Sequence, residues 1–295
     1  DGFYFSNNRN IAGVNLKGNS VGLWAVTSSR NGLSLYNNSN STVNTNSGHI
    51  SGLVMNDVGD EVIAVAGLQG MVIAGIEANR HDFGIEFTSA STVEPKDNSF
   101  GPGVFRNGID FAITFNATAA DASNNRFGGL VFDFHPTLHD AGVIYLSSST
   151  HNNADLSFND IIANNVNSKD TTSRSWVDCQ AGTGGKSRNR VKFSGLQFSG
   201  LTSSIRTGDN GFAIRGACTD FEISNSYLRN VPGTGYFMDD SGADAQARFK
   251  VNLTVHGANH YGFFLRNNGS SASITEVSFN ACEAIDCARQ ATAGA

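Results

Sequence analysis

Hydrophobic and polar residues recur along this chain in two short patterns rather than with a helical period. In the first pattern an apolar residue is followed by a small or polar residue, then by Gly, Asn or Asp, and usually by a second apolar residue. Copies begin at Ile11, Ile73, Phe127, Phe158, Phe193, Ile223, Val255 and Phe279, with looser ones at Leu35 and Phe100. Gly, Asn and Asp enter the left-handed backbone region most readily, so the third position predicts one bend per copy.

The second pattern is a Gly followed by an apolar residue, a variable residue and another apolar residue. Copies begin at Gly22, Gly52, Gly84, Gly108, Gly211, Gly235 and Gly262. Such alternation predicts a strand with one face on a core and the other outside. The first pattern recurs at spacings of 24 to 35 residues from position 73 onward, and copies of the second lie between its copies. A β-sandwich predicts strand signals about every 8 to 12 residues instead.

These interleaved patterns predict an all-β fold, a parallel β-helix of about ten coils stacked roughly 4.8 Å apart. Residues one coil apart in sequence then become neighbours, and one outward position on successive coils forms a lane. We expect a single domain over residues 1–295. The chain begins Asp1-Gly2-Phe3 without Met or a basic segment, which indicates a piece of a longer protein or a processed product.

Composition agrees with a fold made of many turns. The chain has 33 Gly and 33 Asn but only 4 Pro, and 16% charged residues, which disfavours a coiled coil, a helical bundle or a charged disordered tail. A net charge of −6 with six Lys offers no basic field for nucleic acid. Apolar runs stay well below the ~20 residues that span a bilayer, so we expect no membrane insertion.

Cysteine and histidine suggest no metal centre or cofactor. Four Cys in 295 residues make no disulfide framework, and Cys282 is predicted to be a buried free thiol because it falls on a core lane. The pairs His135/His139 and His256/His260 have a His-x3-His spacing without the helix or the Glu that a zinc site of this kind needs.

The Gly-headed strands, the Gly/Asn bends and the polar loops between them resemble the right-handed β-helix of the pectin-lyase-like superfamily. Within it, the chain is most similar to the tailspike or depolymerase class of bacteriophages. The resemblance implies a homotrimer in a virion tail or extracellular setting, with a bacterial surface polysaccharide as partner. Asp239-Asp240 is similar to the paired Asp of polygalacturonases, but the other motifs of that family are absent, so its mechanism is not transferred.

Glu86 and Asp110 are the candidate catalytic residues. They occupy equivalent places in Gly84-Ile85-Glu86-Phe87 and Gly108-Ile109-Asp110-Phe111. If these coils are consecutive, the carboxyls lie close enough to raise one pKa and to act as acid and base in glycoside hydrolysis. A solvated or cation-bridged carboxylate pair is the alternative.

Candidate substrate-binding residues come from the same alignment. Arg215, Asp239 and Arg266 are expected at one outward position, with Asp178 below them, as a charge ladder or as a site for an acidic sugar. Trp24, Phe237 and Phe264 are expected in an outward lane, where exposed aromatic rings suit either sugar stacking or a subunit interface.

Three functions remain open at this stage. The first is a tailspike-like protein that binds and hydrolyses a polysaccharide, and the second is a lyase that cleaves a uronic-acid polymer by β-elimination. The third is a non-catalytic adhesin or structural shaft. The sequence does not identify the sugar, the host or the oligomeric state.

Overall fold

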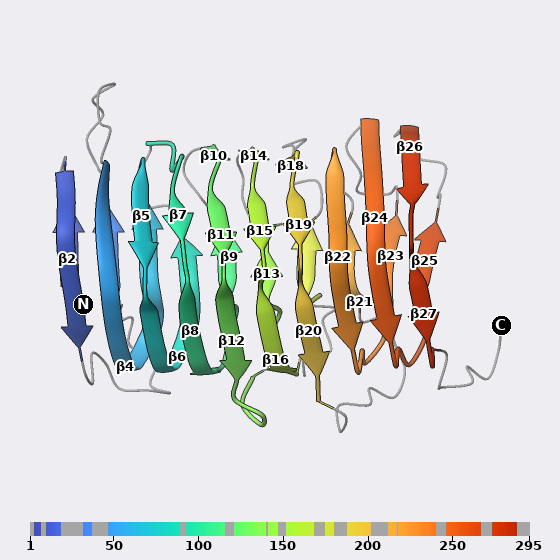
Figure 1. Ribbon diagram of the computed structural model, residues 1–295, viewed down its shortest axis with the longest axis horizontal. Helices are drawn as coiled ribbons and strands as arrows, with labels where there is room; N and C mark the ends of the chain where they lie inside the picture. Colours follow the sequence, from blue (N-terminus) through green and yellow to red (C-terminus); the bar gives the residue numbers. More distant parts are fainter. Residues whose placement is uncertain are drawn as a thin grey trace.

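The computed structural model describes residues 3–6, 10–18, 32–36, 47–88, 93–115, 121–139, 141–146, 152–167, 175–179, 188–201, 212–216, 218–239, 246–266 and 273–287. They form a parallel β-helix, as predicted, and none of the described residues lies in a helix that could cross a membrane. In Figure 1 the nearer strands run downward and the fainter ones upward while the chain advances from left to right, so the winding is right-handed.

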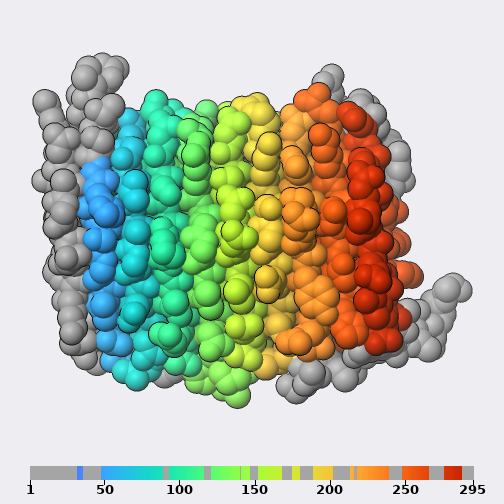
Figure 2. Space-filling model, viewed as in Figure 1, coloured from blue at the N-terminus to red at the C-terminus, as the bar shows by residue number. Residues whose placement is uncertain are grey.

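Each coil contributes strands to three sheet faces. The back face contains β1 (Phe3–Ser6), β3 (Leu33–Tyr36), the last parts of β4 (Ser47–Ala66) and β6 (Ile76–Phe87), β9 (Ile113–Phe115), β13 (Ile144–Tyr145), β17 (Val177–Cys179), β21 (Phe212–Gly216), β23 (Thr234–Asp239) and β25 (Phe263–Arg266). These ten segments correspond to ten coils. In Figure 2 the coloured coils cross the front as bands that follow the order of the chain.

The two front faces share several long strands. The upper front face contains the first parts of β2 (Asn10–Gly18), β4, β22 (Phe221–Arg229) and β24 (Gln246–His256), with β5 (Met71–Ala74), β7 (Ser99–Phe100), β11 (Arg126–Gly128), β15 (Ser157–Asn159), β19 (Lys192–Ser194) and β26 (Ser273–Phe279). The lower front face contains the later parts of β2, β22 and β24, the middle of β4 and the first part of β6. It also contains β8 (Gly103–Gly108), β12 (Leu130–Phe134), β16 (Ile162–Val166), β20 (Gln197–Gly200) and β27 (Glu283–Ile285). A small separate sheet contains β10 (Ala122–Ser123), β14 (Asn153–Ala154) and β18 (Arg188–Asn189).

The core contains rows of stacked rings. Phe100, Phe127, Phe158 and Phe193 are in register on four coils, with ring centroids 5.1, 4.9 and 4.9 Å apart. All four are buried. The first sequence pattern therefore locates these four coils correctly.

The third position of that pattern is a left-handed bend, as predicted. Gly75, Asp160, Asn225 and Ala281 have φ of 61°, 51°, 49° and 50°. The copy that begins at Val255 differs, because its Gly257 lies at another corner of the coil, where its N–H donates to the Ile285 carbonyl. The pattern marks bends reliably without saying which corner they form.

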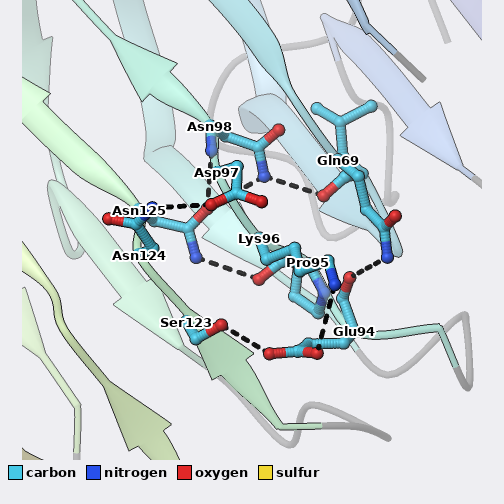
Figure 3. A network of polar contacts seen from close by, with 10 residues as sticks. Gln69, Glu94, Pro95, Lys96, Asp97, Asn98, Ser123, Asn124 and Asn125 are labelled. Carbon is cyan, nitrogen blue, oxygen red and sulfur yellow. Dashed lines mark hydrogen bonds and ion pairs between the residues drawn. The ribbon is translucent and has the colours of Figure 1, made fainter. Parts of the chain in front are cut away.

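Asparagine also stabilises the coil from inside a corner (Figure 3). The side chain of Asn98 donates to the Leu68 carbonyl at 2.8 Å and to Oδ1 of Asn125 at 2.9 Å, and it accepts from the N–H of Met71 at 3.0 Å. Asn125 in turn donates to the Pro95 carbonyl at 3.0 Å. Both amides are buried, so these bonds satisfy main-chain groups that water does not reach.

Two of the four cysteines form a single disulfide, which the sequence analysis does not predict. Cys179 at the end of β17 forms a disulfide with Cys218, across a sequence separation of 39 residues. Their Cα atoms are 5.7 Å apart because the coil brings them together. Cys282 is a free thiol as expected, but it is only partly buried.

Candidate functional site

One outward position of the back face runs from coil to coil as a continuous lane. The strand register orders it as Ser34, Ala64, Glu86, Thr114, Tyr145, Asp178, Arg215, Phe237 and Phe264. We call this series the back lane. Its members point away from the core because the residue before each one faces inward, as Ile85, Ile113 and Val177 do.

Much of the back lane is shielded from solvent although it faces outward. Glu86, Thr114, Asp178 and Phe237 retain 6%, 2%, 5% and 3% of their accessible surface. Removing a charged group from water favours its neutral form. The polar side chains of this lane are therefore held largely away from water.

A pair of carboxyl groups lies beside this lane. Glu61 on β4 precedes Ala64 by three residues, is 8% exposed, and its side chain is hydrogen-bonded to that of Glu86. Burial first, and the hydrogen bond and charge of Glu86 second, raise the pKa of Glu61 from 4.5 to about 8, against smaller opposing effects of its own backbone and of Asp60. At neutral pH Glu61 is therefore protonated and donates to Glu86.

The pair is enclosed by the protein. Oε2 of Glu61 is buried and has no hydrogen-bond partner among the described residues outside the pair. The pair thus combines a proton donor with an acceptor in a site that is shielded from water.

Asp110 is not the partner of Glu86, so the predicted catalytic pairing is wrong in its geometry. Glu86 is in register with Thr114, whereas the N–H of Asp110 donates to the Asp82 carbonyl at 3.1 Å. The reason is a tandem repeat of the strand pattern in one coil. Ile109-Asp110-Phe111 precedes the bend, and Ile113-Thr114-Phe115 forms the strand β9.

The predicted charge ladder on the back face divides into two separate positions. Asp178 and Arg215 are in register on adjacent strands, as expected. Arg215, however, is in register with Phe237 rather than with Asp239. Asp239 and Arg266 are in register with each other two residues further along the strands.

The aromatic residues occupy the C-terminal end of the back lane. The rings of Phe237 and Phe264 stack at 5.6 Å and 10°, which confirms that they are neighbours on adjacent coils. Phe237 is buried rather than exposed, while Tyr261 stacks on Phe264 at 5.2 Å and is 52% exposed. The accessible ring is therefore Tyr261, and Trp24 lies outside the described residues.

An alternating charge ladder does exist, on the upper front side. Arg190 binds Asp155 through two bonds of 2.5 and 2.7 Å, and Arg248 binds Asp220 one coil further on. These arginines lower the pKa of both aspartates. A groove of about 370 Å³ follows the ladder, lined by four basic and three acidic side chains over Phe221 and Phe249.

Sequence reasoning missed Glu61 and Tyr261. Asp60 and Glu61 stand directly before the apolar run Val62–Ala66, but no Gly opens that strand, so the second pattern passes over it. Tyr261 stands directly before Gly262, one position ahead of the aligned pattern. An acid or an aromatic residue at the entrance of a predicted strand would have been the usable signal.

Among the described residues, no group of three His, Cys, Asp or Glu side chains is placed to hold a metal ion. No family model matches the sequence, and no curated protein matches it.

Solved structures that resemble the fold include the following two. One is the catalytic domain of a GH87 alpha-1,3-glucanase in complex with nigerose, at 13% identity and a TM-score of 0.41, covering 97% of this chain and 60% of that one. The other is a single-residue variant of that catalytic domain, also with nigerose, at 12% identity and a TM-score of 0.41, covering 97% and 59%. The present chain thus spans about 60% of the length of these structures.

Proposed function

We propose that this protein hydrolyses a polysaccharide, with Glu61 as the general acid and Glu86 as the nucleophile or base. The observation that carries the proposal is the hydrogen-bonded pair, in which the pKa of Glu61 is about 8 and Glu86 accepts the hydrogen bond from the Glu61 carboxyl. Glycoside hydrolysis needs one protonated carboxyl for the leaving oxygen and a second carboxyl on the other side of the reacting carbon.

Once the groups that shield it move aside, the back lane offers a path for an extended sugar chain. From Glu86 it continues through Thr114, Tyr145, Asp178 and Arg215 toward the aromatic rings. Five coil steps separate Glu86 from Phe237, roughly 24 Å at about 4.8 Å per coil. Hydroxyl, carboxyl and guanidinium groups suit sugar hydroxyls, and Tyr261 offers a face on which a sugar ring stacks.

The closeness of the two carboxyls favours a particular stereochemical outcome. Retaining glycosidases hold them about 5 to 5.5 Å apart, and inverting ones about 6.5 to 9.5 Å apart. A hydrogen-bonded pair needs only a small separation to admit a glycosidic bond in the retaining arrangement. We therefore expect the first product to keep the anomeric configuration of the substrate, which NMR of the fresh product would reveal.

The decisive experiment measures reducing ends released from a panel of bacterial capsule and O-antigen polysaccharides. Glu86→Gln and Glu61→Gln are each expected to lower the rate by at least about 100-fold, since each removes a proton-transfer group. Asp155→Asn is the matched control on the front side and should leave the rate unchanged. If Asp110→Asn abolishes cleavage and Glu61→Gln does not, the assignment to Glu61 is wrong.

Burial of both glutamates favours a second candidate function, that of a non-catalytic polysaccharide-binding protein. With 8% and 6% exposure, the pair meets a substrate only after the groups above it move aside. In that case no polysaccharide in the panel is cleaved, while binding persists and weakens on Tyr261→Ala. Products that absorb in the near ultraviolet would instead indicate a lyase.

The biological setting is part of the same proposal. The similarity of the sequence patterns to tailspikes supports a bacteriophage tail or another extracellular location, a bacterial surface polysaccharide as substrate and a homotrimer. Sedimentation of the purified protein tests the trimer directly.

A further inference from the structure

A second cluster of titratable side chains lies on the lower front face, away from the back lane. Tyr227 lies on β22, His256 ends β24 and Asp286 follows β27, so three successive coils contribute one residue each. The hydroxyl of Tyr227 is 3.3 Å from Nδ1 of His256, and Nε2 of His256 is 3.1 Å from Oδ2 of Asp286. These strands face the viewer in Figure 1, with the back strands behind them.

The chemistry of the three groups assigns the direction of both bonds. A carboxylate only accepts, so Nε2 of His256 carries the hydrogen that is donated to Asp286. Nδ1 of the neutral ring is then an acceptor, and the Tyr227 hydroxyl donates to it. A hydroxyl that donates to an imidazole, which in turn donates to a carboxylate, is the arrangement of an activated oxygen nucleophile.

The cluster is accessible and has a cation beside it. Tyr227 is 37% exposed, and the side chains of His256 and Asp286 are 32% and 65% exposed. Arg229 follows Tyr227 by two residues, so it shares the outward face, and it is in register with His256. Its guanidinium has one long bond of 3.4 Å to Ser199, which leaves other N–H groups to bind a developing negative oxygen.

We propose that Tyr227, His256, Asp286 and Arg229 form a second catalytic site, which hydrolyses small acyl esters through an acyl-tyrosine. The Tyr227 oxygen attacks the ester carbonyl carbon while its proton passes to Nδ1 of His256, and Arg229 faces the resulting oxyanion. The carbon–oxygen bond to the alcohol then breaks, and the alcohol takes the proton from His256.

Water completes the reaction by the same route. It attacks the acyl-tyrosine and gives a proton to His256, the carboxylic acid leaves, and the Tyr227 oxygen takes the proton back. Asp286 holds the ring in the tautomer that both steps need, so it is a positioning residue. The open site suits an acyl group carried on a larger molecule, such as an acetylated sugar chain.

The test uses the full chain and 4-nitrophenyl acetate, with release of 4-nitrophenolate and peptide mass spectrometry as readouts. We expect acetyl on Tyr227, no such adduct with Tyr227→Phe, and acetylation slowed about 100-fold by His256→Gln. His49→Gln is the control, because it removes an exposed imidazole from β4 and should leave the rate unchanged. Equal melting temperatures of the variants exclude unfolding as the cause.

The role of Asp286 has its own readout. Asp286→Asn should slow acetylation about tenfold, and Asp286→Glu should restore part of the rate. Acetyl found on a lysine instead of Tyr227, or an unchanged rate with Tyr227→Phe, would overturn the proposal. This test does not depend on Glu61 and Glu86, since the Glu86→Gln variant should acetylate normally.

Discussion

Three aspartates on the front side and Glu61 on the back side stand on the same repeating scaffold but ionise in opposite ways. On the front, Asp57, Asp155 and Asp220 each bind an arginine one coil further on, and their pKa values are lowered. On the back, Glu61 has another carboxyl as its partner, and burial raises its pKa to about 8.

This difference shows that the distance between coils and the surroundings of a carboxyl group affect its ionisation separately. A β-helix brings any two residues at one position of successive coils to within about 4.8 Å. Whether such a pair becomes an ion pair or an acid beside a base depends on the sign of the partner and on access to water. Coil spacing alone therefore does not identify a catalytic pair.

The largest effect is expected when a third carboxyl is placed on the back lane. Ala64 is fully buried and in register with Glu86, so Ala64→Asp should lower the free energy of unfolding by about 3 to 5 kcal/mol, as an uncompensated buried charge does. Gln197→Asp places the same group on an exposed front strand and should cost about 0.5 kcal/mol or less. Similar urea-unfolding curves for the two variants would contradict the claim that a carboxyl costs more on the back face than on the front.

Reduction of the Cys179–Cys218 disulfide should have the next largest effect. The bond closes a loop of 39 residues between two coils, for which chain entropy predicts about 3 to 4 kcal/mol. Thermal unfolding of Cys179→Ser/Cys218→Ser, compared with the wild type, measures the loss. The Cys282→Ser variant should have the same melting temperature as the wild type. If the Cys179→Ser/Cys218→Ser variant also has that melting temperature, the disulfide is absent in solution.

The pH dependence of stability should be opposite for the two sides. Because the folded pKa of Glu61, about 8, lies above the unfolded value of 4.5, the folded state holds the proton more tightly between these values. Stability from this group is complete below about pH 4.5 and is lost as pH rises to 8, by an amount on the order of a few kcal/mol. Glu61→Gln should abolish that decline in urea midpoints measured from pH 5 to 9.

At acid pH, the pH dependence of stability is set by the aspartates of the front side. Asp155 has a lowered folded pKa, so its contribution is present at neutral pH and is lost as the pH falls below its unfolded value of 3.8. Glu61→Gln should leave this acid limb intact. A flat wild-type profile from pH 5 to 9 would contradict the raised pKa of Glu61.

The smallest effect is expected from the front ion pairs. Asp155→Asn breaks the bond to Arg190, in which both side chains are about half exposed, and should cost under about 1 kcal/mol. In 1 M NaCl the difference from the wild type should shrink further, because salt screens exposed charges. A cost that persists in high salt would place this pair among the shielded groups.

The fold was predictable because its signal repeats. Stacked rings such as Phe127 and Phe158, and bends such as Asp160 and Asn225, recur on several coils, so errors at single copies do not change the architecture. The approximate number of coils follows from the same recurrence.

The site was less predictable because the sequence pattern does not distinguish strand registers that differ by an even number of residues. Arg215 was aligned two residues away from its true neighbour Phe237, and Asp110 stands four residues before Thr114, the true neighbour of Glu86. Shifts of two or four residues keep every side chain on its own face, so the alternation of apolar and polar residues looks equally good. Only hydrogen bonding between coils distinguishes these registers.

The direction of the strand pairing also has a mechanical consequence. Hydrogen bonds between coils lie along the axis of the rod. A force that pulls its two ends apart therefore acts equally on every interface between coils. The narrowest back strand, β13, contributes only Ile144 and Tyr145 to its pairing with β9 and with β17. Under tension the coils should separate first beside this strand, because it contributes the fewest paired residues on the back face.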